Sequence, residues 1–317
     1  MNTINRHTPT MSKAKQVRAD IEKKIADLFI KGLEETGQWV KPWASALPPM
    51  NLETRRPYNG VNVLICMLSG YSKPWFMTYK QAEKLGGHVK KGEKSLPLIF
   101  WNWRTFTKKN AQGEEETTTI PFLKTYNVFN IDQVEGIDLE EILSDEEKDA
   151  LAAGPRFEDF DLMVKSWENA PKIIEGPMID QACYVPSTDT VEMPAQSAFH
   201  TTNGYYMTLA HELIHATGHE SRCDRALLPA AMNRDSYSFE ELIAEIGATL
   251  LGATYGFSTE KEQENSKAYV RGWVKLLKEK PAMILQAASK AQKGIALMEG
   301  KAKDEKASEK EKEEAEA

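Results

Sequence analysis

The feature that most constrains this chain is the segment from His211 to His215, which reads HELIH. In a helix, residues four apart project from the same face, so His211 and His215 would stand one turn apart on one side. Two imidazoles placed in this way can bind one zinc ion, and Glu212 can then act as general base on a water at that ion. The competing interpretation is an amphipathic helix with two hydrogen-bonded histidines and a surface glutamate. Of the 6 histidines in the chain, four lie between positions 200 and 219, which favours the metal site.

A catalytic zinc site of this kind needs a third protein ligand. The pattern HExxHxxGxxH takes that ligand from the same segment. Gly218 stands where this pattern requires glycine, but Ser221 occupies the position of the third histidine. His219 comes two residues early and could be reached only if the helix continued through Gly218, which leaves it a minor candidate. The sequence therefore argues against a site with three histidines.

A carboxylate from a second helix is the other way to complete the site. The segment from Phe239 to Leu251 is strongly apolar, and Glu241 and Glu245 lie four apart beside its apolar stripe. Carboxylates at such positions are costly to bury unless they are paired or bind a metal. We predict Glu241 as the third ligand and Glu245 as a hydrogen-bond partner of a ligand histidine. Glu240 is the rival ligand, and a helix with three solvated acids is the remaining alternative. The spacing resembles the glutamate pattern of thermolysin-like enzymes and the E-x-x-A-N segment of ImmA/IrrE peptidases.

Composition places the chain among globular proteins. Its 317 residues, 41% hydrophobic and 27% charged, are enough for two domains. The longest apolar runs, such as 61–68, are too short to span a bilayer, and the N-terminus lacks the apolar core of a secretory signal. Three widely separated cysteines argue against a disulfide framework. We expect a cytoplasmic protein that does not associate with membranes.

Charge and tryptophan are concentrated differently in the two halves. Residues 1–130 hold 20 Lys and Arg against 11 Asp and Glu, although the whole chain is acidic, and they hold five of the 7 tryptophans. Bases can stack on such rings while cations follow the phosphates, so we predict that this half binds single-stranded nucleic acid. The alternative is that most of these tryptophans build a core that the lysines merely solvate. The turn at 86–94 lacks the spacing of a phosphate-binding P-loop. The candidate DNA contacts are Trp39, Trp43, Arg55, Arg56, Tyr58, Trp75, Lys90, Lys91, Lys94, Trp101 and Trp103.

Periodicity and turn residues predict an α+β protein of two domains. The first, 12–135, would combine helices with a small antiparallel sheet, and the second, 156–300, would be a zincin-like (gluzincin) domain. Between them we expect an acidic linker, 136–155, with a solvated face and no partner. The tail 301–317 has too little apolar surface to pack and is expected to be disordered. The first domain should contain helices over 12–32, 61–68 and 81–85 and strands over 75–79, 98–106 and 122–129, with a hairpin tip at 108–118. The second should contain helices over 157–171, from 205 onward through the HELIH motif, and over 239–251, 266–277 and 281–298, with strands over 172–174, 182–185 and 190–193.

An ordered series of motifs then identifies a family resemblance. In the first half these are WVKPW (39–43), YNGVN (58–62), PWFMTYKQA (74–82), GGHVKKGEK (86–94) and FNIDQVEG (129–136). In the second half they are YVPSTDTVEMP (184–194), YYMTLAHELIHATGH (205–219) and SFEELIAEIGA (238–248). Taken together, the chain resembles the ArdC-type antirestriction proteins of conjugative plasmids, which are related to the N-terminal region of TraC-type plasmid primases. The charged tail after Gly300 is not part of this pattern.

The resemblance implies an N-terminal domain that binds single-stranded DNA and a C-terminal zincin-like metallopeptidase domain, with the strand at 184–194 as the active-site edge. It also implies protection of incoming plasmid DNA from restriction during conjugation. We therefore expect Zn²⁺, or Mn²⁺ in its place, and a protein substrate among host restriction components. Two other classes stay open. One is a DNA-binding protector whose metal domain is structural, and the other is a peptidase whose basic half binds a protein.

Overall fold

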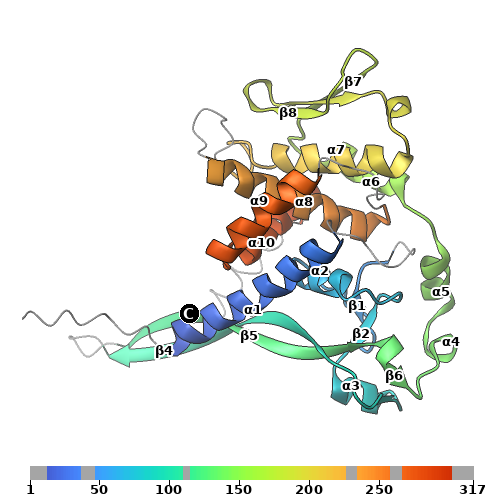
Figure 1. Cartoon of the computed structure of the whole chain (residues 1–317), viewed down its shortest axis with the longest axis vertical. Coiled ribbons are helices and arrows are strands. Elements are labelled where there is room, and N and C mark those ends of the chain that lie inside the picture. The colour runs from blue at the N-terminus through green and yellow to red at the C-terminus, as the bar shows by residue number, and fades with distance from the viewer. Residues whose placement is uncertain (1–12, 37–46, 110–114, 226–233, 258–265, 302–317) are drawn as a thin grey trace, which may run out of the picture.

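The computed structural model of the protein describes residues 13–36, 47–109, 115–225, 234–257 and 266–301 (Figure 1). Trp39, Trp43 and the charged tail after residue 301 lie outside these ranges. The described chain mixes helices and sheets, which confirms the α+β class. In Figure 1 the N-terminal half forms the lower part of the molecule, and helices α7 and α8 lie above it, beneath a small sheet. No described helix is both long and apolar enough to cross a membrane.

The lower half is built on a sheet with the strand order β1-β2-β5-β4. Its largest part is a long antiparallel ribbon of β4 (Leu96–Lys109) and β5 (Glu115–Asn130). These strands extend beyond the predicted ones because β-branched residues continue the pairing, as in Thr107 opposite Thr117. β1 (Met50–Asn51) pairs in parallel with β2 (Trp75–Met77), which adds one parallel pair to the predicted antiparallel sheet. Helix α2 (Val61–Leu68) lies in the crossover that a parallel pair requires.

The remaining elements of this half pack around the sheet. Helix α1 buries Ile25, Phe29 and Leu33 and contacts β5. The side chain of Thr78 caps α3 by accepting a hydrogen bond from the Gln81 amide (3.3 Å). The turn predicted at 86–94 contains a short strand, β3, which pairs with β6. The bounds are α1 (Lys13–Thr36), α3 (Tyr79–Lys84), β3 (His88–Val89), η1 (Ile131–Gln133) and β6 (Val134–Glu135).

The upper half places a three-stranded sheet over a layer of helices. The strand order is β7-β9-β8, with β7 parallel and β8 antiparallel to β9, so β8 is an edge strand. Helix α7 packs against β8, β9 and α8, and α10 packs against α8. The bounds are α6 (Phe157–Ser166), β7 (Lys172–Gly176), β8 (Cys183–Val185), η2 (Pro186–Thr188), β9 (Thr190–Pro194), η3 (Gln196–Ala198), α7 (Thr202–Ala216), α8 (Arg234–Tyr255), α9 (Ser266–Glu279) and α10 (Met283–Met298).

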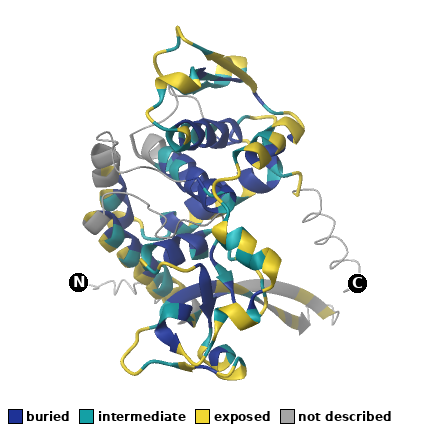
Figure 2. Cartoon of the chain, turned by 90° about the vertical axis from the view of Figure 1, so that its right-hand side faces the viewer, coloured by how far each residue is buried: buried dark blue, intermediate teal, exposed yellow. Residues whose placement is uncertain are grey.

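One hydrophobic core runs through both halves. Its buried cluster includes residues of α1 and α2 together with residues of α7, α8, α9 and α10 (Figure 2). Polar contacts also join the two halves: Lys278 Nζ of α9 lies 3.0 Å from Glu34 Oε1 of α1, and the Gly60 amide before α2 donates to Gln292 Oε1 of α10 at 3.1 Å. The two halves are thus joined by shared packing as well as by the segment between them.

The acidic segment at 136–155 does not present only a solvated face, and that prediction was wrong. It folds into α4 (Leu139–Ile142) and α5 (Asp145–Ala152). Leu143 is buried in a small core cluster with Trp75. Arg55 forms an ion pair with Glu147 (2.8 Å) and donates to the Ile142 carbonyl (2.7 Å). The segment is held in place because leucines and isoleucines alternate with its acids, which gives it an apolar side that can pack.

The close approach of α7 and α8 yields a stability prediction. A Cβ added at Gly247 of α8 would lie 2.6 Å from Ile214 of α7. We expect Gly247→Ala to reduce the free energy of unfolding by about 1–3 kcal/mol, because this core has no room for a methyl group. Gly272→Ala on α9 is the matched control, since a Cβ there meets nothing within 4 Å. It should stabilise the helix slightly. Thermal unfolding of both variants checks this, and equal unfolding temperatures would refute it.

Candidate metal centre

Helix α7 brings the two histidines together. It begins at Thr201, whose hydroxyl accepts a hydrogen bond from the Gly204 amide (3.1 Å). One turn apart on this helix, the Nε2 atoms of His211 and His215 lie 3.1 Å from each other. The helix ends at Ala216, and the His219 ring instead contacts Ser221, with 2.8 Å between Nδ1 and Oγ. His219 therefore does not join the other two histidines.

Helix α8 supplies the third group. Glu241 Oε2 lies 3.6 Å from His211 Nε2, and Glu241 Oε1 lies 3.5 Å from His215 Nε2. One ligand atom from each of the three residues lies within 4.8 Å of the others. A tetrahedral ion with bonds of about 2.0–2.1 Å needs donors roughly 3.3 Å apart. The separation of the two Nε2 atoms is close to that value, and each histidine has one oxygen of Glu241 at a similar distance, so these residues fit a divalent metal after a small turn of the Glu241 carboxylate.

A further carboxylate lies behind each histidine. Glu245 Oε2 is 3.6 Å from His211 Nδ1, and Glu240 Oε1 is 3.5 Å from His215 Nδ1. Glu240, the rival ligand in the sequence, has both oxygens engaged by the guanidinium of Arg225. Carboxylates in these positions orient a ligand histidine and make it a stronger donor.

The electrostatics of the cluster favour a cation. Burial alone would lower the pKa of His211, but the carboxylates of Glu241 and Glu245 raise it well above its ordinary value. Burial would raise the pKa of Glu240, yet His215 and Arg225 keep it below its usual value. The negative charge of these acids is therefore concentrated around the two histidines, where a bound metal would neutralise it.

Glu212 lies beside the three candidate ligands and is fixed by a strand. It is 9% exposed, and its Oε2 accepts a hydrogen bond from the backbone amide of Tyr184 on β8 (2.8 Å). The Tyr184 hydroxyl in turn donates to Asp189 (2.8 Å) and accepts from Arg222 (3.2 Å). Sequence reasoning missed the Tyr184 amide because a backbone donor leaves no mark in the sequence. It also missed Arg225, whose role depends on how two helices pack.

The predicted DNA contacts fall into two groups. Trp75 is 0% exposed, so its assignment as a base-stacking residue was wrong: its ring fills the core, with the Arg55 guanidinium 5.4 Å from its centroid. Arg55 and Lys90 donate to backbone carbonyls of Ile142 and Asp132, which makes them structural contacts here. Tyr58 packs its ring against Phe76.

The other predicted contacts are exposed or lie outside the described residues. Arg56, Lys91, Lys94 and Trp101 are exposed, and Trp101 is 44% exposed on β4. The side chain of Trp103, like Trp39 and Trp43 as a whole, falls outside the described part of the structure. Sequence reasoning missed two neighbours of this group: Phe100 is 38% exposed, and the Arg18 guanidinium lies 5.5 Å from the centroid of Trp101.

Two histidines and a glutamate on packed helices, with an adjacent acid and an edge strand beside it, form the arrangement expected of a zincin-like metallopeptidase domain. Comparison with known proteins agrees: residues 168–290 match the MPTase-PolyVal family of zincin-like metallopeptidases, and residues 19–129 match the N-terminal domain of the anti-restriction factor ArdC. The protein belongs to the ArdC antirestriction family.

Solved structures and curated relatives support this membership. The metal-free structure of antirestriction protein ArdC from plasmid R388 shares 36% identity and a TM-score of 0.68, covering 90% of this chain and 98% of the other. The Mn(II)-bound structure of that protein shares 34% identity and a TM-score of 0.65, covering 89% of this chain and 98% of the other. DNA primase TraC of Escherichia coli is 32% identical over 88% of this chain, which spans only 27% of the primase. Uncharacterized protein y4eC of Sinorhizobium fredii is 28% identical over 89% of this chain and 92% of its own.

Proposed function

We propose that the protein is a metal-dependent peptidase that binds single-stranded DNA and protects incoming plasmid DNA in the cytoplasm from host restriction. The observation that supports the peptidase most strongly is the convergence of His211, His215 and Glu241, with Glu212 on the same helix as the histidines. Imidazole and carboxylate donors in this number suit zinc. The Mn(II)-bound relative makes manganese the alternative.

The residues around the metal would divide the work of peptide hydrolysis. A bound divalent ion would polarise the peptide carbonyl and lower the pKa of a water molecule. Glu212 takes the proton from that water and passes it to the leaving amine. The Tyr184 amide occupies only Oε2 of Glu212, so Oε1 remains for the proton transfer. β8 pairs with β9 on one side, and its other edge can align an extended peptide beside the ligands.

A restriction subunit assembled on DNA is the substrate class that unites the two activities. DNA binding by one half would bring the peptidase half close to enzymes that act on the same DNA. The test incubates the metal-loaded protein with purified restriction subunits, with and without single-stranded DNA. New fragments that require both the metal and the DNA would support the proposal. Intact subunits under every condition would contradict it.

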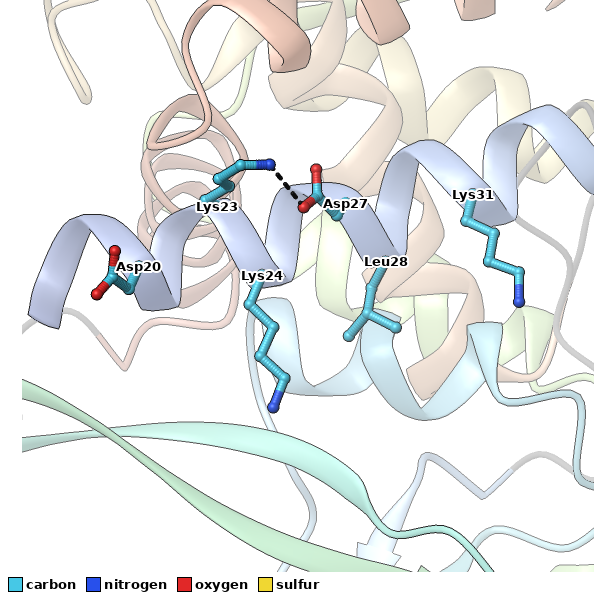
Figure 3. A pocket seen from close by; sticks show the side chains of 6 residues that line it. All are labelled: Asp20, Lys23, Lys24, Asp27, Leu28 and Lys31. Carbon is cyan, nitrogen blue, oxygen red and sulfur yellow. Dashed lines mark hydrogen bonds and ion pairs between the residues drawn. The ribbon is translucent and has the colours of Figure 1, made fainter.

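The β4–β5 ribbon and α1 carry the proposed DNA surface. Trp101 is exposed on the face of the ribbon where the Arg18 guanidinium of α1 lies 5.5 Å from its ring centroid. Phe100 is exposed on the opposite face, with Lys124 as its cross-strand partner on β5. An open pocket of about 460 Å³ lies along α1, and Figure 3 shows Lys24 and Leu28 pointing from the helix toward the side of the ribbon. Lys23, by contrast, is paired with Asp27 (2.9 Å). Exposed rings next to cations suit a single strand, whose bases stack while its phosphates follow the charge.

Removal of the exposed ring should weaken DNA binding. We expect Trp101→Ala to raise the Kd for an oligothymidine by about 5- to 150-fold, because stacking of one base is worth about 1–3 kcal/mol. Tyr79→Ala is the matched control, since Tyr79 is also exposed (50%) but belongs to helix α3 and not to the β4–β5 ribbon. Fluorescence anisotropy at several salt concentrations measures both variants. Equal affinity of Trp101→Ala and wild type, or affinity that does not depend on salt, would argue against this surface.

A further inference from the structure

Arg225 lies in the segment that follows α7 and is almost completely buried, with 9% exposure. Its backbone amide donates to the Gly218 carbonyl (2.8 Å). Its guanidinium donates to the Thr217 hydroxyl (2.9 Å) and to the Ile214 carbonyl (2.7 Å). The carbonyl and the hydroxyl belong to the end of the helix that carries the candidate histidine ligands. These three hydrogen bonds hold Arg225 against the C-terminal end of α7.

The remaining donors of Arg225 reach across to α8. Its Nε lies 3.2 Å from Oε1 and 3.1 Å from Oε2 of Glu240, and its Nη2 lies 2.8 Å from Oε1. Glu240 is 7% exposed, and the same Oε1 is 3.5 Å from Nδ1 of His215. A continuous buried chain of polar contacts thus runs from Arg225 through Glu240 to one of the candidate ligands.

Stability alone gives a weak reason for this ion pair. A buried ion pair can often be replaced by apolar residues of similar size with little loss, or even a gain, in stability. The position of this pair suggests a more specific use. A carboxylate that accepts a hydrogen bond from Nδ1–H fixes the tautomer in which Nε2 of the same ring carries the lone pair that binds a metal. A guanidinium that occupies both oxygens of that carboxylate also keeps it from competing for the metal.

We propose that Arg225 is a positioning residue of the metal centre, holding Glu240 against Nδ1 of His215 so that Nε2 faces the ion and Glu241 is the coordinating acid. This role rests on the proposed metal site formed by His211, His215 and Glu241. It assigns different tasks to two adjacent glutamates: Glu241 binds the metal, while Glu240 orients a ligand from behind.

The decisive variant replaces both members of the pair, as Arg225→Met with Glu240→Leu. Metal-free protein is titrated with Zn²⁺ by calorimetry and with Co²⁺ by visible absorption, which reports the ligand geometry. We expect metal binding about 10- to 100-fold weaker than in wild type and a changed Co²⁺ spectrum. The unfolding temperature without metal should stay at or above that of wild type, because apolar residues then fill the space. Wild-type affinity with an unchanged spectrum would overturn the role of Arg225.

Two single variants complete the test. Arg225→Lys keeps the positive charge but loses the planar guanidinium, so its metal affinity should lie between those of wild type and the double variant. Arg222→Gln is the control, because the Arg222 side chain is also buried and also donates to the last turn of α7, at the Ala216 carbonyl (2.7 Å), but its other donors reach Asp189 and Tyr184 and no carboxylate beside a candidate ligand. It should leave metal affinity unchanged, and an equal loss in Arg222→Gln would reduce Arg225 to a general structural role. Failure of wild-type protein to bind metal would overturn the metal site itself, an outcome distinct from the others.

Discussion

Glu212→Gln is expected to bind metal as wild type does and to lose peptide hydrolysis, with the rate falling by about 10²- to 10⁴-fold. The glutamine keeps the shape of the side chain, and its amide oxygen can still accept the Tyr184 hydrogen bond that holds Glu212 in place. It cannot accept a proton from water, so only the acid–base step is removed. Mass spectrometry of an unstructured peptide mixture after incubation with metal-loaded protein measures the loss.

The control for this experiment is Glu220→Gln. Glu220 is exposed just beyond α7, so this substitution removes the same charge as Glu212→Gln without changing the candidate metal centre. Full hydrolysis by Glu212→Gln would show that another group acts as base. Protection of plasmid DNA by Glu212→Gln at wild-type level would favour the DNA-binding protector whose metal domain is structural.

His211→Ala and Glu241→Ala are expected to lower the metal content from about one ion per chain to background, because two protein ligands rarely retain zinc. The neighbouring acids Glu245 and Glu240 already lie against Nδ1 of His211 and of His215, so they are not placed to replace a lost ligand. Elemental analysis after dialysis against trace metal measures the content. We expect peptide hydrolysis to disappear in both variants.

Two milder variants set the scale for this loss. Glu245→Ala removes the acid beside His211 Nδ1 but no ligand, so it should weaken metal binding by about 10- to 100-fold without changing the stoichiometry at excess metal. His219→Ala removes an imidazole whose Nδ1 contacts Ser221. His219→Ala should leave both the metal affinity and the stoichiometry at the wild-type values. Retention of full metal content by Glu241→Ala would contradict the proposed ligand set.

Local sequence patterns predicted much of the fold. The helix at 61–68 has the predicted bounds, and the strands at 172–176, 183–185 and 190–194 lie where β-branched runs between turn residues placed them. The errors and omissions concern contacts between distant parts of the chain. The parallel pairing of β1 with β2 depends on a crossover, and the packing of the acidic segment depends on Arg55, 92 positions before Glu147. Neither the β1–β2 pairing nor the packing of the acidic segment can be recognised from a local sequence pattern.

The site was partly predictable for the same reason. Spacing within one helix places His211 next to His215, and a buried acid on an apolar helix points to Glu241, so the sequence was enough to propose these residues. Spacing favoured Glu241 but left Glu240 as a rival, because which of two adjacent helix residues faces the histidines depends on how α8 packs against α7. Arg225 makes the difference, because it engages Glu240 and leaves Glu241 facing the histidines.

The DNA-binding surface was harder to predict residue by residue. A cluster of tryptophans and lysines indicates a class of ligand, but the burial of each ring depends on how the sheet packs. Trp75 and Trp101 look alike in the sequence, yet one is enclosed in the core and the other is 44% exposed.

The central claim is that His211, His215 and Glu241 hold one divalent metal ion. Anomalous diffraction at the zinc absorption edge, from crystals of zinc-loaded protein, tests it most directly. We expect one peak at about 2.0–2.2 Å from Nε2 of both histidines and from an oxygen of Glu241, with Glu240 still paired to Arg225. A peak bound by Glu240 in place of Glu241, or no peak between α7 and α8, would contradict it.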